Sequence, residues 1–202
     1  MKNKILNKII FIILILTNFV LAEDFKIESS VINISENGNL VKSSEGVKII
    51  SNNGIIIEGE NSIYDKKKIT IEVFGKVKVN DKIKQIEINA DKIVYDKLND
   101  VLTSDGEVKV NDKIKQIEIN ADKIVYDKLN DVLTSDGEVK VNDKIKQIEI
   151  NADKIVYDKL NDVLTSDGEV KVNDKIKQIE INADKIVYDK LNDVLTSDGE
   201  VK

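Results

Sequence analysis

The chain has 202 residues, a formal net charge of −6 and a hydrophobic content of 41%. It contains no histidine, cysteine, tryptophan, proline or arginine, which excludes an imidazole general base, a thiol nucleophile, a disulfide and the common soft-metal ligands. Acidic charge without a basic block makes nucleic acid a poor partner. The hydrophobic content indicates a folded protein, and the missing residue types indicate that it is not an enzyme.

The first residues have the layout of a secretory signal. Three lysines among the first eight residues precede an apolar run that is short for a membrane span and ends at the small residue Ala22. We therefore expect residues 1–22 to be a cleavable signal peptide and the mature chain to be exported. An uncleaved inner-membrane anchor facing the periplasm is the alternative. Removing the segment leaves 28 lysines against 37 acidic residues, a net charge of −9.

Residues 25–76 read as an opening hairpin followed by diverged copies of a later unit. Two extended runs, 25–34 and 40–50, flank a turn that contains Asn37-Gly38, the strongest short hairpin signal. Further along, Gly75 precedes Gly106 by 31 residues, the same spacing that separates the two Tyr-Asp pairs at 64 and 95.

Four identical 31-residue units follow, at 77–107, 108–138, 139–169 and 170–200. Such a period is typical of a supersecondary unit that buries its apolar face only by stacking on its neighbours. We therefore expect one domain over residues 23–202, with function in a surface or groove that runs along the stack.

Each unit predicts two long bent strands. Leu102, Ser104, Val108 and Val110 alternate with polar residues, and a second alternating run slips in phase at Asp91-Lys92. Runs of about 13 residues are too long for straight strands, so we expect each to bend near its middle. Turn-forming residues separate the runs.

These features predict an all-β fold, an elongated antiparallel β-jelly-roll of bent strands built from 31-residue repeats. A parallel β-helix is the structural alternative, but its coils do not use hairpin turns.

The unit also resembles a known family. Ala90-Asp-Lys-Ile-Val-Tyr-Asp96 followed by Val101-Leu-Thr-Ser-Asp-Gly-Glu-Val108 resembles the A-D-x-x-x-Y … L-x-x-x-G-x-V pattern of the OstA-like, or LptA-like, periplasmic lipopolysaccharide-transport family (organic solvent tolerance-like N-terminal domain). The resemblance spans nearly the whole mature chain, although the family diversifies its strands where this chain repeats them. It implies a bent-strand jelly-roll that carries lipopolysaccharide between the two membranes and stacks end to end with related domains.

The resemblance also implies a lipid-binding trough, lined by the inward positions of the identical units. The plain alternative is that these side chains are only the core. The lipid-binding candidates are Ile86, Ile88, Ile93, Tyr95, Leu102, Val108, Val110, Ile117, Ile119, Ile124, Tyr126, Leu133, Val139 and Val141.

We expect no catalytic residue, no metal and no cofactor. The run Asp96–Glu107 has the acidic ends of a calcium loop, but Leu98 stands where an oxygen ligand belongs and Val101 where glycine is required. Five lysines against seven acidic residues per unit predict a solvated outer face of mixed charge.

Two functions remain open from the sequence. The first is a non-catalytic periplasmic carrier or bridge for lipopolysaccharide or a related lipid in outer-membrane assembly, which holds acyl chains in an apolar seam between two sheets. Its partners would be related jelly-roll transport proteins, or further copies of the chain in a head-to-tail homo-oligomer, joined through edge strands. The second is an exported structural or adhesive β-repeat protein with a dry core.

Overall fold

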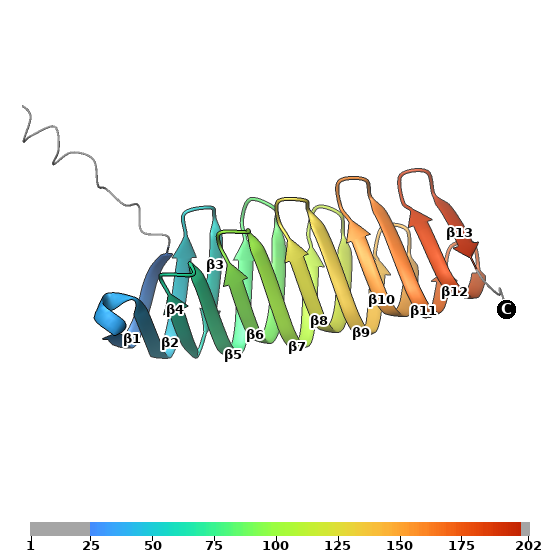
Figure 1. The fold of residues 1–202 in the computed structure, drawn as a ribbon. Helices are drawn as coiled ribbons and strands as arrows, with labels where there is room; N and C mark the ends of the chain where they lie inside the picture. The colour runs from blue at the N-terminus through green and yellow to red at the C-terminus, as the bar shows by residue number, and fades with distance from the viewer. Residues whose placement is uncertain (1–24, 199–202) are drawn as a thin grey trace, which may run out of the picture.

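The computed structural model describes residues 25–198, which form 13 strands and one short 3-10 helix (Figure 1). The expected signal peptide lies outside the described residues, as do the last residues of the fourth identical unit. The elements are β1 Phe25–Ser35, η1 Glu36–Gly38, β2 Leu40–Ser51, β3 Ile55–Gly59, β4 Asn61–Asp65, β5 Thr70–Asp81, β6 Ile86–Asp96, β7 Val101–Asp112, β8 Ile117–Asp127, β9 Val132–Asp143, β10 Ile148–Asp158, β11 Val163–Asp174, β12 Ile179–Asp189 and β13 Val194–Asp198.

All of these strands belong to one antiparallel sheet, in which each strand from β5 to β12 pairs with the strand after it in the chain. β3 and β4 together occupy one strand position, because both lie between β2 and β5. The antiparallel pairing confirms the predicted bent-hairpin fold and rules out the parallel β-helix. The two expected layers are two halves of a single sheet, since every long strand runs through both.

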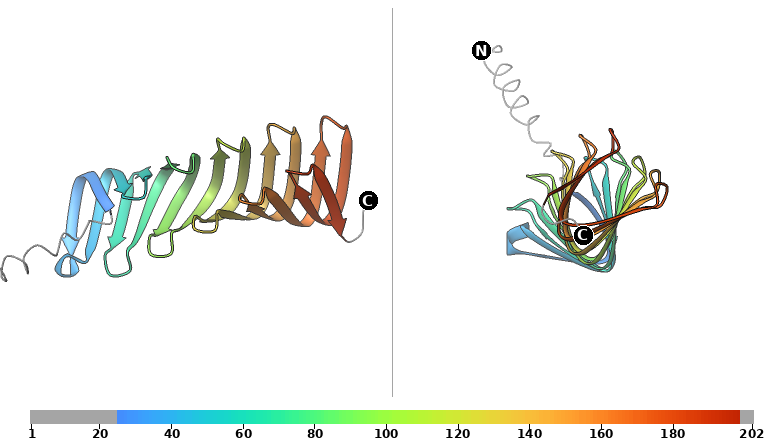
Figure 2. Two further views of the ribbon diagram at one scale, coloured as in Figure 1. Left: turned by 90° about the horizontal axis from the view of Figure 1, so that it is seen from above. Right: turned by 90° about the vertical axis from the view of Figure 1, so that its right-hand side faces the viewer.

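The sheet is folded lengthwise into a V, as the end-on view in Figure 2 shows. The fold line follows a break in strand register. Between β6 and β7 the register shifts between the pairs Asn89–Lys109 and Lys92–Asp105, which leaves an extra residue on β7. We call the two halves of the V its arms and the fold line the bend.

Glycine makes the bend possible. Gly106 has a φ of +79° and the next residue, Glu107, a φ of +42°, so two successive residues turn the strand. A Cβ on Gly106 would lie only 2.9 Å from the Cβ of Asp91 on the neighbouring strand. The predicted bends at Asp105-Gly106 and Ala90-Asp91 are therefore confirmed.

The turns form two rows along the open side of the V. The first row contains residues 52–54, 82–85, 113–116, 144–147 and 175–178, and the second contains 66–69, 97–100, 128–131, 159–162 and 190–193. From β4 to β12, an aspartate at the end of each strand caps the turn that follows: Asp81 Oδ1 accepts hydrogen bonds from the backbone N–H groups of Ile83 and Lys84 at 3.0 and 2.9 Å. We call the line along which the two rows face each other the mouth.

The core fills the space between the arms and runs along the whole stack as one cluster of buried side chains. Within residues 25–198, no helix is long and apolar enough to span a membrane.

Candidate functional site

The interior between the arms contains every residue that the sequence placed in the trough. All 14 belong to the same hydrophobic cluster, and each is at most 1% exposed. They come from β6 to β9, where side chains of alternating residues point inward from both arms. The structure thus brings the candidate lipid-binding residues together as a close-packed core.

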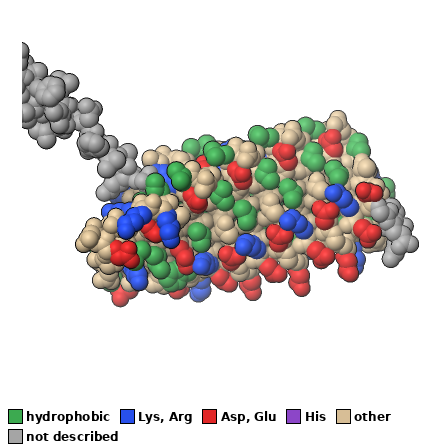
Figure 3. All heavy atoms as spheres, in the orientation of Figure 1, with side chains coloured by type: hydrophobic (Ala, Val, Ile, Leu, Met, Phe, Trp, Pro, Cys, Tyr) green, Lys and Arg blue, Asp and Glu red, His purple; other side chains and the backbone are tan. Residues whose placement is uncertain are grey.

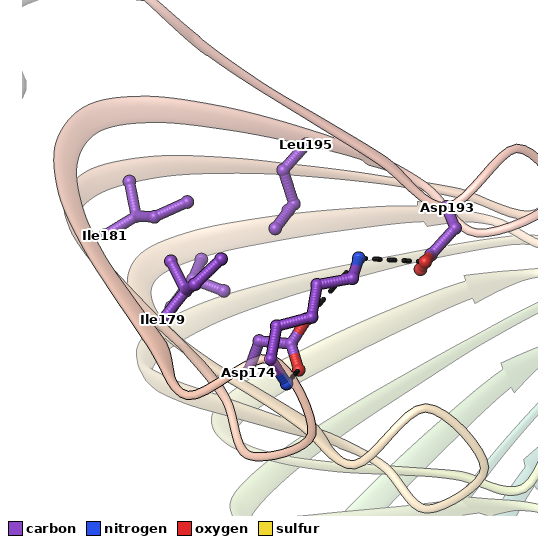
Figure 4. Close-up of a pocket in the computed structure, with 7 residues that line it drawn as sticks. Asp174, Ile179, Ile181, Asp193 and Leu195 are labelled. Atoms are coloured by element: carbon purple, nitrogen blue, oxygen red, sulfur yellow. Dashed lines mark hydrogen bonds and ion pairs between the residues drawn. The ribbon is translucent and has the colours of Figure 1, made fainter.

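The interior is less covered where the described strands begin and end. Ile32 and Ile34 on β1 are exposed, as is Ile179 on β12. At the β12–β13 end a pocket of about 190 Å³ is lined by apolar side chains that include Ile181 and Leu195, with the Lys177–Asp193 ion pair beside them (Figure 4). Apolar interior surface is therefore accessible at both ends of the described array.

Ion pairs close the mouth. Lys128, Lys159 and Lys190 of the second row lie 3.0, 2.7 and 2.7 Å from carboxylate oxygens of three aspartates that cap first-row turns. The charged groups are withdrawn from water: the side chains of Lys159 and its partner Asp112 are only 5% and 1% exposed. The aspartates are, in the same order, Asp81, Asp112 and Asp143.

A second set of ion pairs crosses the mouth in the opposite sense. Lys84 of the first row donates a 2.9 Å hydrogen bond to Asp131 of the second row, and Lys115 donates one of the same length to Asp162. Lys159 also lies 3.7 Å from Asp131, so successive pairs are linked along the mouth. We call this continuous set of cross-mouth pairs the ladder.

The repeated tyrosine is tied into the ladder. Tyr126 and Tyr157 are buried, and each donates a 2.9 Å hydrogen bond from its hydroxyl to Asp131 or Asp162. Burial, together with the neighbouring carboxylate, raises the pKa of both phenols. Burial alone would raise the pKa of Asp131 as well, but hydrogen bonds from Lys84 and Tyr126 hold that pKa below its ordinary value.

Near the N-terminus an aromatic cluster takes the place of the ladder. The Phe25 ring packs edge-on against Tyr64 and Tyr95, with centroids 5.0 and 5.8 Å apart, and Lys97 lies 5.4 Å above it. Asn53 donates hydrogen bonds to the hydroxyl of Tyr95 and to a carboxylate oxygen of Asp100. A neutral amide therefore stands here where later units use a lysine.

The sequence reasoning missed the ladder. It placed the lysines on a solvated outer face, which is wrong for Lys128, Lys159 and Lys190, because their side chains are buried across the mouth. One signal was present: Asp81 continues the inward alternation of Val77 and Val79. An acidic residue in the inward phase at a strand end calls for a buried partner.

The solved structures place this fold among known proteins. No protein-family model and no curated protein matches the chain. Among solved structures it is similar to LptH from Pseudomonas aeruginosa, the LptA homologous periplasmic component of the lipopolysaccharide transport device, with a TM-score of 0.51 and 18% sequence identity. The match covers 56% of this chain and 82% of LptH. The chain therefore has the bent-strand jelly-roll fold of a periplasmic lipopolysaccharide-transport component.

Proposed function

We propose that this protein is a non-catalytic periplasmic lipid carrier or bridge in outer-membrane assembly, with lipopolysaccharide or a related lipid as its ligand. The observation that carries the proposal is the single apolar interior between the arms, which runs along the array. Between the bend and the mouth, its inward polar side chains are small serines such as Ser104 and Ser135. The fold shared with LptH is consistent with this role.

Lipid would occupy the interior by separating the arms. The inward side chains are too tightly packed to leave room for an acyl chain while the arms are closed. Each methylene that leaves water is stabilised by about 0.8 kcal/mol, so a long acyl chain gains enough to replace contacts between the arms.

The partners follow from the sheet edges. Within the described residues, β1 and β13 each pair on one side only, which leaves a row of backbone N–H and C=O groups at either end. Such edges add strands readily, so we propose head-to-tail stacking with related jelly-roll proteins or with further copies of this chain. Stacking would join the apolar interiors into one path.

Photo-crosslinking in a lipopolysaccharide-producing host tests the proposal. A photoreactive leucine analogue at Leu133, which is buried between the arms, should label lipid. The same analogue at Glu118, which forms ion pairs on the outer face of β8, should not. Equal labelling from the two positions, or no labelling from either, would contradict a lipid-filled interior.

A structural or adhesive repeat protein is the second candidate, and the buried ladder favours it because the ladder seals a dry core. In that case, changing the number of identical units would alter only the reach of the protein. The purified chain would then carry no lipid-sized adduct in native mass spectrometry.

A further inference from the structure

Two rows of exposed aliphatic side chains border the mouth. Each turn of the identical units has one at its tip, and these side chains are 58 to 73% exposed. A single exposed aliphatic residue is ordinary, but a regular row of them is informative. The isoleucine row contains Ile83, Ile114, Ile145 and Ile176, and the leucine row contains Leu98, Leu129, Leu160 and Leu191. In Figure 3, hydrophobic side chains recur along the length of the face shown.

The fold does not need aliphatic residues at these tips. The turn backbone is held by the capping aspartates, as Asp96 Oδ1 accepts a hydrogen bond from the N–H group of Asn99. The diverged turn at 66–69 has the same form with Lys67 where the later units have leucine. A lysine therefore satisfies the turn of the leucine row equally well, and the turn backbone does not explain why leucine recurs there.

Both rows lie beside the ladder. Ile83 precedes Lys84, whose ammonium group reaches Asp131 across the mouth, and Leu129 belongs to the turn that ends at Asp131. Successive turns of one row are two strands apart, or about 9.6 Å. The side chain of Ile83 also leans along its row, since its Cδ1 lies 3.0 Å from where a Cβ on Gly54 would be. The tips thus form two apolar borders that repeat at every second strand along the mouth.

Charge distinguishes the mouth from the bend. At the mouth Lys84 and Lys128 pair with Asp131 and Asp81 in the ladder, and the later units repeat this neutralisation. The bend carries Asp91, Asp105 and Glu107 against Lys92, and acidic side chains line the lower edge of the face in Figure 3. An uncharged acyl chain therefore meets its most favourable surface at the mouth.

We infer that the two aliphatic rows are a docking site for the acyl chain of an amphiphile, which enters the interior sideways through the mouth as the ladder opens. The inference rests on the proposed function and adds the route of entry. The acyl chain first lies along the tips. The charged rungs then part, and the chain reaches the interior, while the polar headgroup stays outside.

The rate of uptake tests this route. The probe is a long-chain fatty acid with an environment-sensitive fluorophore, mixed with the full chain in a stopped-flow instrument. Replacing the isoleucine row by threonine should slow uptake by at least about fivefold with the final bound amount unchanged, because contacts made only on the way in alter the rate and not the equilibrium. The matched control is the Val→Thr change at Val94, Val125, Val156 and Val187, which are half-buried on the outer face.

Crosslinking provides the second arm, because the chain has no cysteine of its own. A short thiol crosslinker between Lys115→Cys and Asp162→Cys bridges the mouth and should block uptake. The same crosslinker between Lys123→Cys and Asp105→Cys joins neighbouring strands on the outer face and should leave uptake unchanged.

The outcomes separate the two proposals. If the parent protein takes up the probe and neither the threonine variant nor the mouth crosslink changes the rate, the sideways route is wrong. The carrier function would still stand. A change in oligomeric state of the threonine variant without a change in uptake would assign the rows to protein contact and also overturn it. No uptake by the parent protein would remove the carrier function and the route together.

Discussion

The ladder makes a sharp prediction about stability at Lys159. Its ammonium group lies 2.7 Å from Asp112 Oδ2, and both side chains are almost completely buried. Lys159→Met removes the cation and leaves a buried carboxylate without its counter-charge. Breaking a buried pair in this way costs about 3–5 kcal/mol, so the variant should lose that much unfolding free energy.

Two further variants isolate the cause. Adding Asp112→Asn removes the stranded charge, and the amide oxygen can still accept the hydrogen bonds from the Ile114 and Lys115 N–H groups that cap the turn. The double variant should therefore recover most of the loss. The surface control is Lys154→Met, whose ion pair with Asp136 is about half exposed, and it should cost no more than about 1 kcal/mol.

Urea unfolding followed by circular dichroism measures all three changes, provided that the slope of the transition is the same in each variant. Added salt should weaken the contribution of Lys154 and leave that of Lys159 nearly unchanged, since buried pairs are poorly screened. The mouth would be open to water if Lys159→Met lost no more unfolding free energy than Lys154→Met. The same would follow if the double variant with Asp112→Asn were as unstable as Lys159→Met alone.

Three other predictions follow from the bend, the ladder and the repeat. Gly137→Ala should cost about 2–4 kcal/mol in urea unfolding, because its φ of +79° is unfavourable for alanine and its Cβ would lie 2.9 Å from that of Asp122. Gly38→Ala, with a φ of +88° and open space around it, should cost only about 1–2 kcal/mol. Because the pKa of Asp131 is lowered on folding, its contribution to stability is present above about pH 4 and is lost as the pH falls further, so Asp131→Asn should flatten the acid limb of the stability profile. Deleting residues 108–138 should give a folded protein about 9.6 Å shorter by small-angle X-ray scattering, and an unfolded product would contradict stacking of equivalent units.

The fold could be predicted from the sequence because its signals are local. Alternation of apolar residues sets the strands, Gly106 and the phase slip at Asp91 set the bend, and turn residues set the hairpins. The interior candidates follow from the same alternation. Each of these signals operates within one unit and its immediate neighbour, which is the range over which sequence patterns are informative.

The ladder could not be predicted because it joins distant residues. Lys84 and Asp131 are 47 residues apart, or one and a half units, and they meet only after the sheet has folded along the bend. A lysine in a turn resembles every other solvated lysine until the opposite row of turns is in place. The sequence gives the composition of the mouth, but the angle between the arms decides which charges are buried.

Identical units raise the question of what fixes the register of the array. A shift by one whole unit restores every strand pair and every rung of the ladder, so neither can distinguish the correct register from a slipped one. The diverged N-terminal part can, because Phe25 packs against Tyr64 and Tyr95, and Asn53 supplies a contact to Asp100 that lysine supplies elsewhere. The aromatic cluster therefore anchors the first rung, and each later unit takes its place from the one before it. The identical units can therefore repeat the same mouth along the array, while the contacts that set the register are needed only in the N-terminal part.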